Sequence, residues 1–171
     1  MPKSVVSNAG PLIALAKLNL LHLLKQLYGQ IHFPRSVYEE TVIEGLQQGF
    51  EDAHTLRLFL IQEKWEAVEV DDMPDKLAGL NLDRGERESL ALALSRNALL
   101  LMDEERGREE ARQRQVKVCG TLGILIEAYH HDFITSDQLR FYFSQIEKRT
   151  DIWVSPSLCR RLLKQVLGSE D

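Results

Sequence analysis

One short apolar segment constrains the fold of this chain more than any other. Residues 98–102 are uninterrupted apolar sequence, and Asp103 follows directly. A run of this length, bounded by polar residues, is typical of a strand that is buried on both faces of a parallel sheet. Helix-like segments stand before and after it, so we predict a parallel sheet with helices on both faces.

Strand-like and helix-like segments alternate along the rest of the chain, without repeats or low-complexity tracts. Besides residues 98–102, β-rich runs predict strands at residues 4–7, 31–33, 67–70 and 116–119. Apolar spacing and capping residues predict helices at residues 12–27 (with a break near Asn19), 34–44, around 56–60, within 71–82, 83–94, 104–115, 122–129, 135–148 and 155–167. This order indicates an α/β domain with two further helices at its C-terminal end.

Three of these helices have clear starting signals. Asp83 with Glu86, and Thr135 with Gln138, have the spacing of a capping box, in which each residue satisfies a backbone N–H of the other. Ser155 stands before a proline, which is a common pair at a helix start. We therefore expect helices to begin directly after these caps.

The composition is that of an ordinary soluble protein. The 171 residues fit one domain, residues 1–171, and 44% of them are hydrophobic and 27% charged. Cys119 and Cys159 form neither a close pair nor a metal-binding spacing, so we expect reduced and inert thiols. No apolar run is long enough to span a bilayer, and the first residues lack the features of a signal peptide. We therefore expect a cytoplasmic protein without membrane contact.

The net charge of −5 limits how this chain could bind nucleic acid. Proteins that coat nucleic acid indiscriminately are usually basic. RNA would therefore have to bind through a local patch. An acidic excess also fits a group of carboxylates around a divalent cation.

Polar residues follow the predicted strands, where sites form in parallel sheets. Asn8 follows the first strand, Asp103 and Glu104 follow the long apolar strand, and Thr121 follows residues 116–119. A glycine-rich phosphate loop is missing, which argues against a dinucleotide or nucleoside-triphosphate fold. A site at this edge would need further acids to join Asp103.

Two predicted helices offer such acids. In the first, Val37, Glu40, Thr41 and Glu44 share one side at helical spacing. In the second, Glu88 shares a stripe with the apolar residues 91 and 92. Carboxylates that converge at a sheet end suit Mg²⁺ or Mn²⁺, which activate water and stabilise charge on a phosphate.

Each of these acids also has a structural interpretation. The chain has 26 acids, and most helices display some to solvent. Glu86 could serve only in the capping box with Asp83, Glu40 could be a solvated helix charge, and Asp103 could cap the helix that follows it. Taken alone, the residues favour these structural roles.

Five segments, in the same order along the chain, resemble the PIN-like domain family, in particular a branch related to the toxins of VapBC-type toxin–antitoxin pairs. The segments are residues 5–15 (VVSNAGPLIAL), 33–40 (FPRSVYEE), 83–93 (DRGERESLALA), 100–104 (LLMDE) and 119–125 (CGTLGIL). The resemblance implies a three-layer α/β/α fold with a central, mainly parallel sheet. It covers a core of about residues 4–134, so the helices of residues 135–168 are an addition.

The resemblance also implies a metal-dependent ribonuclease site, directed at single-stranded or unstructured RNA and built from three or four acids. The implied catalytic acids are Glu40, Glu88 and Asp103. The implied ligands of Mg²⁺ or Mn²⁺ are these three acids with Asn8, Glu86 as the alternative to Glu88, and Glu104 beside Asp103. Thr121 stands where its hydroxyl could support the site.

Asn8 is the departure from the family pattern, which has an aspartate at this position. Its amide oxygen can ligate a metal but brings no negative charge. Asparagine at this position is familiar in the same branch. Two hypotheses therefore stay open, namely a working nuclease and a weak or inactive relative.

Four arginines, Arg106, Arg108, Arg112 and Arg114, follow Asp103 on one polar helix. They could position RNA, or they could form exposed ion pairs with the glutamates between them. We favour ion pairs for most of them and keep Arg108 as the candidate for a functional role.

The function implied by the resemblance is that of an endoribonuclease toxin whose partner is a cognate antitoxin. The alternative is a catalytically weak or inactive module that binds a protein or RNA. We also predict a homodimer, because related domains commonly pair and because residues 12–28 carry more leucine than one helix face needs.

Overall fold

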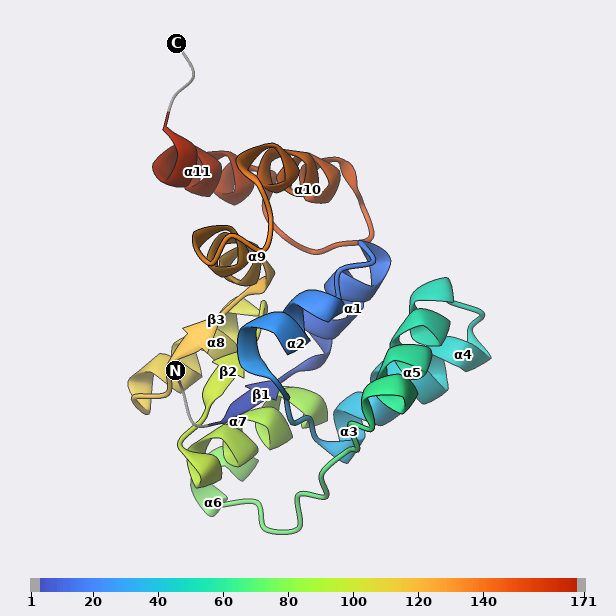
Figure 1. Ribbon diagram of the computed structural model, residues 1–171. Helices are drawn as coiled ribbons and strands as arrows, with labels where there is room; N and C mark the ends of the chain where they lie inside the picture. Colours follow the sequence, from blue (N-terminus) through green and yellow to red (C-terminus); the bar gives the residue numbers. More distant parts are fainter. Residues whose placement is uncertain (1–3, 169–171) are drawn as a thin grey trace. The chain divides into compact units, whose positions relative to one another are not determined.

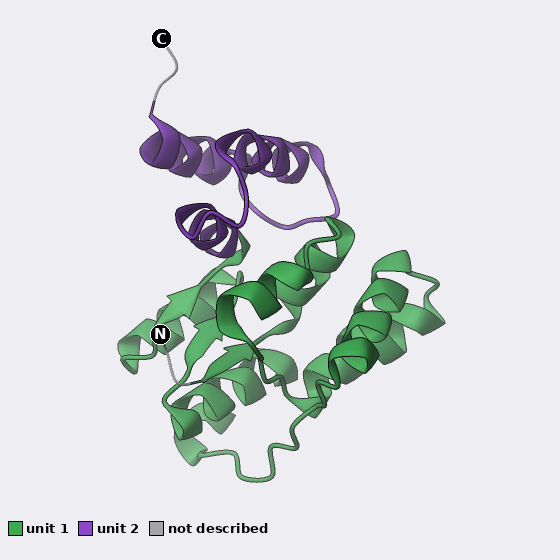
Figure 2. Cartoon of the chain, in the orientation of Figure 1, with its two compact units in different colours: residues 1–121 green, residues 122–171 purple. Residues whose placement is uncertain are grey.

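Figure 1 shows a computed structural model of the chain, which describes residues 4–168. The chain divides into two compact units, residues 1–121 and residues 122–171 (Figure 2). The division falls near residue 121, whereas the sequence placed the end of the core at about residue 134.

The first unit contains a parallel sheet, as predicted. Its strands are β1 (Val5–Ser7), β2 (Leu99–Leu101) and β3 (Val118–Cys119), in the order β1-β2-β3. The predicted strands at residues 31–33 and 67–70 are reduced to single parallel bridges, from Val6 to His32 and from Pro34 to Val68. Pro34 has no N–H to donate, which limits pairing at this edge.

Helices fill most of the first unit. A break at Asn19, whose φ is 57°, separates two of them, as the sequence predicted. The helices are α1 (Ala9–Lys17), α2 (His22–Tyr28), α3 (Arg35–Tyr38), η1 (Glu39–Glu44), α4 (Gly45–Gln47), α5 (Glu51–Glu63), α6 (Asp75–Ala78), α7 (Arg84–Arg96) and α8 (Glu105–Gln113).

These helices cover both faces of the sheet. Val6, Leu100 and Met102 pack in one apolar cluster with α7, for example with Leu90. In Figure 1, α1 and α2 lie on one side of the strands and α6 and α7 on the other. This α/β/α order is the predicted fold class, and it places the ends of β1 and β2 side by side.

The segment after Pro34 differs from the continuous α-helix that we predicted. Residues Glu39–Glu44 form the π-helix η1, in which hydrogen bonds span one more residue than in an α-helix. The wider turn changes which residues face inward. Thr41 and Val42 are buried, whereas Glu40 and Glu44 are exposed, so the inward-facing acidic stripe of the prediction was wrong.

One of the two grounds for the dimer prediction, a surplus of leucine, is contradicted by the structure. The leucines between residues 12 and 28 are almost all buried within the chain, so they leave no apolar surplus on this surface. The buried ones are Leu12, Leu15, Leu20, Leu21, Leu23, Leu24 and Leu27.

The second unit is helical. It consists of most of α9 (Thr121–His130) with α10 (Ser136–Lys148) and α11 (Pro156–Leu167). The predicted capping box of Thr135 and Gln138 and the Ser155 cap are both present. Within residues 4–168, no helix has the length and apolar character needed to cross a membrane.

Candidate functional site

Asn8 lies where β1 ends, and the oxygen of its side chain has no hydrogen-bond partner among the described residues. Its backbone N–H donates to Leu101 O at 2.9 Å, which aligns the ends of β1 and β2. The side chain is buried, and Oδ1 accepts no hydrogen bond from any described residue. A buried oxygen without a partner costs about 1–3 kcal/mol. Asn8 Oδ1 is therefore a candidate ligand atom.

Gly85, in the first turn of α7, opens a space on which three oxygen atoms converge. A Cβ atom on Gly85 would lie 3.4 Å from Glu40 Oε2 and 3.5 Å from both Asn8 Oδ1 and Asp83 Oδ1. All three oxygens thus lie within 3.5 Å of one point, so no two of them are more than twice 3.5 Å apart. Glu86 joins them through its electrostatic effect on Glu40. We call Asn8, Glu40, Asp83 and Glu86 the open acidic cluster.

The charged neighbours of Glu40 in this cluster, Asp83 and Glu86, are both negative. Its side chain reaches solvent, but its carboxyl group is partly buried. Partial burial, followed by the charges of Asp83, Glu44 and Glu86, raises the pKa of Glu40 from 4.5 to about 7. Its carboxylate has no hydrogen bond or ion pair within residues 4–168. A cation bound here would remove the repulsion.

Asp83 and Glu86 also form the predicted capping box at the start of α7. Glu86 N donates to Asp83 Oδ1 at 2.8 Å, and Asp83 N donates to Glu86 Oε2 at 2.9 Å. Burial raises the pKa of Glu86, and the charges of Asp83 and Glu104 add to this, although the bond from Asp83 N opposes it. The cap thus holds two carboxylates beside Glu40.

Asp103, at the end of β2, is in a different situation. Thr121 N donates to its Oδ1 at 2.7 Å, and Thr121 Oγ1 donates to its Oδ2 at 2.6 Å. Burial raises the pKa of Asp103, while these bonds and the positive charge of Arg108 act in the opposite direction. We call Asp103, Thr121 and Arg108 the Asp103 cluster.

Two glycines make room for the Asp103 cluster. A Cβ on Gly120 would lie 2.6 Å from Arg108 Nη1 and 2.8 Å from Asp103 Oδ1, so any side chain here would displace these groups. A Cβ on Gly10 would lie 3.4 Å from Asp103 Oδ2, so Asp103 packs beside the start of α1. Asn8 and Asp103 are therefore neighbours along the same end of the sheet.

Glu88 and Glu104 have partners of their own. Glu88 is buried on the α7 stripe, as predicted, and Arg84 Nε donates to its Oε1 at 3.2 Å. Arg84 also lies 3.9 Å from Glu39, so this ion-pair chain links α7 to η1. Glu104 accepts from two N–H groups at the start of α8, so it is Glu104, and not Asp103, that caps this helix.

Most of the arginines on α8 are engaged structurally. Arg112 pairs with Glu105 and Arg114 with Glu110, while Arg106 donates to Asn81 O. Arg108 Nη1 donates to Met102 O at 3.2 Å, and its buried Nε lies 3.8 Å from Glu105 Oε2 without a hydrogen-bond partner among the described residues. Its place beside Asp103 keeps it as the candidate for a functional role.

The resemblance implies a divalent ion, and the oxygen atoms of the open acidic cluster are its candidate ligands. No three His, Cys, Asp or Glu side chains within residues 4–168 lie close enough to hold a metal. Two carboxylates and one unpartnered amide oxygen do converge, however, and they are oxygen ligands. Mg²⁺ typically takes one or two carboxylates and keeps several waters. The open acidic cluster therefore fits a partly hydrated ion.

Sequence reasoning missed the role of Asp83 in this cluster and treated it only as a cap. The available signal was Gly85, two residues further along. Glycine is unfavourable within a helix, so it often marks a position where other groups approach closely.

An α/β/α domain with acids beyond the strand ends is the class that this fold and this site define. A sequence profile described as a PIN domain matches residues 4–167. The chain therefore belongs to the PIN domain family. Such domains have a nuclease-type fold, generally bind RNA and generally use divalent metal ions. No curated protein matches the chain.

Proposed function

We propose that this protein is an endoribonuclease that depends on Mg²⁺ or Mn²⁺ and hydrolyses phosphodiester bonds in unstructured RNA. The observation that carries the proposal is the open acidic cluster, in which the uncompensated Glu40 meets the unpartnered Asn8 Oδ1. Asn8, Glu40 and Asp83 would hold the ion, with Glu86 and Asp103 beside them. A bound ion would stabilise negative charge on the phosphate and make water a stronger nucleophile.

The residues of the chain supply the remaining functions. The pKa of Glu40 is about 7 without an ion, and an ion bound beside it would favour the charged carboxylate that acts as its ligand. Thr121 fixes the orientation of Asp103, and Arg108 sets its charge environment. We assign Glu88 a positioning role, because its contact with Arg84 holds α7 against η1. Glu104 has a comparable role at the start of α8.

The proposal extends to a toxin role, with a cognate antitoxin as partner and with a homodimer acting in the cytoplasm. The resemblance to VapBC-type toxins supports it. Exposed aromatic side chains in the second unit would offer a partner apolar surface, since Trp153 is 92% exposed and Phe141 is 57% exposed. A small reading frame directly upstream of the gene would support the antitoxin.

A second candidate function is a catalytically weak or inactive module that binds RNA or a protein. The observation that favours it is the neutral Asn8 together with the lack of three converging carboxylates within residues 4–168. Such a module would retain the fold without cleaving RNA.

Calorimetric titration with Mn²⁺, beside a cleavage assay on unstructured RNA, separates the two functions. For a nuclease, the wild type binds Mn²⁺ and cleaves, and Glu40→Gln lowers cleavage by about 100-fold or more. Glu109→Gln, which removes an exposed glutamate of α8, is the matched control and should retain full cleavage. If purified protein binds Mn²⁺ but leaves RNA intact, the module is correct and the nuclease is not.

A further inference from the structure

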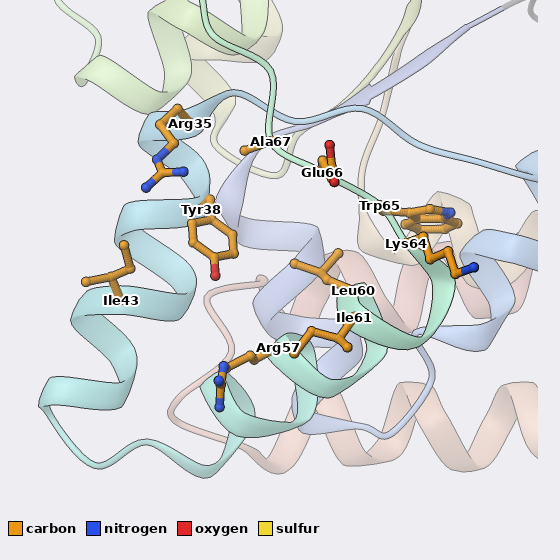
Figure 3. A pocket seen from close by; sticks show the side chains of 10 residues that line it. All are labelled: Arg35, Tyr38, Ile43, Arg57, Leu60, Ile61, Lys64, Trp65, Glu66 and Ala67. Carbon is orange, nitrogen blue, oxygen red and sulfur yellow. The ribbon is translucent and has the colours of Figure 1, made fainter.

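A cavity of about 670 Å³ lies in the first unit, outside the open acidic cluster (Figure 3). Ligand pockets commonly have volumes of this order. Side chains from α3, η1 and α5 line it, with the residues that follow α5. The lining residues that matter here are Arg35, Tyr38, Ile43, Arg57, Ile61 and Lys64.

The lining is cationic in a protein of net charge −5. It contains three cations and one acid, Glu66. Arg57 and Lys64 are exposed, and the side chain of neither forms a hydrogen bond or ion pair with any residue of the described part of the chain. Two such cations beside one cavity would suit an anionic ligand.

The cavity also has flat and apolar faces. The guanidinium carbon of Arg35 lies 5.4 Å from the centroid of the Tyr38 ring, so the two form a cation–π pair. Ile43 and Ile61 are exposed beside them, 36% and 61% respectively. Nucleobases stack on aromatic rings and on guanidinium planes of this kind. Trp65, in contrast, is buried against Phe59 and only forms a wall.

The cavity and the open acidic cluster are supplied by one continuous segment. Tyr38 ends α3 and lines the cavity, and Glu40, two residues later in η1, belongs to the cluster. Side chains two residues apart on a helix point in different directions, so an RNA strand that presents a phosphodiester to Glu40 would have to pass around this helix to reach the cavity.

We propose that this cavity binds a nucleotide of the single-stranded RNA that is cleaved at the open acidic cluster. The base stacks against Arg35 and Tyr38, and phosphates of the strand pair with Arg57 and with Lys64. This inference rests on the proposed ribonuclease function. An acidic peptide could also meet the cations, but its carboxylates would leave the stacked face unused.

The stacking contact is tested by fluorescence anisotropy with a short, labelled, unstructured RNA in EDTA. Tyr38→Leu keeps apolar bulk but removes the π face, whereas Tyr38→Phe keeps it. Loss of one stacked base weakens binding about 5- to 150-fold. We expect Tyr38→Leu to fall in this range and Tyr38→Phe to bind as the wild type does. Equal affinities for all three proteins would overturn the stacking contact.

The phosphate contact is tested by the salt dependence of the same binding. Arg57→Ala and Lys64→Asn should each reduce the slope of log affinity against log salt by about 0.7. Asparagine is chosen because Lys64 has a φ of 58°, which asparagine tolerates. Lys76→Ala removes an exposed cation of α6 and serves as the control of equal charge. An unchanged slope in both cavity variants would mean that no phosphate of the RNA binds in the cavity.

A cleavage assay with Mn²⁺ separates this inference from the proposed function. If the cavity binds RNA for cleavage, the variants raise KM more than they lower kcat. If the wild type cleaves RNA and the variants have an unchanged KM, the proposal for the cavity is wrong and the proposed ribonuclease function stands. Lack of both RNA binding and cleavage in the wild type overturns both proposals. Binding of a glutamate-rich peptide that depends on Arg57 and Tyr38, with RNA binding unaffected, assigns the cavity to a protein partner.

Discussion

The open acidic cluster and the Asp103 cluster lie at the same end of one sheet, yet they are built on opposite principles. Both oxygens of Asp103 accept hydrogen bonds from Thr121, and the positive charge of Arg108 lies beside them. The Glu40 carboxylate accepts no such hydrogen bonds within residues 4–168, and the charges that act on it, those of Asp83, Glu44 and Glu86, are all negative. Burial raises the pKa of both acids, but the protein compensates only Asp103. Of the two clusters, the open acidic cluster is therefore the one that a bound cation would stabilise more.

Adding a negative charge to the open acidic cluster should have the largest effect on the difference between the two clusters. Asn8→Asp is nearly isosteric, so packing should hardly change, but it places a carboxylate beside Glu40 and Asp83. Like charges repel in the absence of metal, so the apo protein should lose stability. With the ion bound, we expect Mn²⁺ affinity to rise by about 10- to 100-fold, at least as much as an outer-shell partner contributes.

Calorimetric titration of Mn²⁺ into both proteins measures this effect, and RNA cleavage should rise with the affinity. A gain in affinity without cleavage would favour the binding module. Unchanged or weaker Mn²⁺ binding in the aspartate variant would mean that Asn8 is not a ligand, and the open acidic cluster would lose its assignment.

Removing the Asp103 carboxylate should destabilise the Asp103 cluster and with it the folded protein. Asp103→Ala leaves Thr121 N and Thr121 Oγ1 without their charged acceptor and removes the negative charge beside Arg108. Hydrogen bonds to charged groups contribute about 1.5–3 kcal/mol, so we expect a loss of about 2 kcal/mol in the free energy of unfolding. Urea unfolding without metal measures it. Glu40→Ala is the control and should cost nothing or stabilise the fold, so equal losses in the two variants would contradict the contrast.

A third change fills the space between the oxygens without altering any charge. A methyl group on Gly85 would meet Glu40, Asn8 and Asp83 at ordinary contact distances, so Gly85→Ala should fold. Alanine also favours the helix by about 0.5–1 kcal/mol. We therefore expect a higher melting temperature together with weaker Mn²⁺ binding. Gly79→Ala, in open space after α6, is the control. Undiminished Mn²⁺ affinity in the Gly85 variant would place the ion elsewhere.

Local rules predicted much of this molecule. The caps at Asp83 and Thr135, the break at Asn19 and the buried strand before Asp103 depend on a few neighbouring residues, and the structure confirms each of them. The resemblance added the order of the elements, which single segments could not supply. The site residues Asn8, Glu40 and Asp103 came from strand ends and from that order.

What could not be predicted depends on distant contacts. The π-helix at Glu39–Glu44 turns Glu40 out of the expected stripe, because its hydrogen-bond spacing differs from the assumed 3.6-residue period. The pairing of Glu88 with Arg84, and the convergence of three oxygens on Gly85, require the placement of α7 against β1 and η1. Periodicity in the sequence carries no information about this placement.

The smallest expected effect concerns pH and follows from the uncompensated charge of Glu40. Its pKa is 4.5 in an ordinary environment and about 7 in the folded protein, so between these values the folded state binds more protons than the unfolded state. Stability should therefore fall as pH rises through this interval and stay lower above it. Glu40→Gln removes this dependence. Its advantage in melting temperature over the wild type should be small at about pH 5 and larger at about pH 8. Solvent screens the exposed side chain, so the difference amounts to a few degrees at most.

Mn²⁺ should then raise the melting temperature of the wild type at the higher pH and leave the glutamine variant nearly unchanged, because only the wild type offers the ion a charged ligand at this position. A melting-temperature difference that is the same at both pH values would mean that Glu40 is already compensated in solution, and the contrast with Asp103 would disappear.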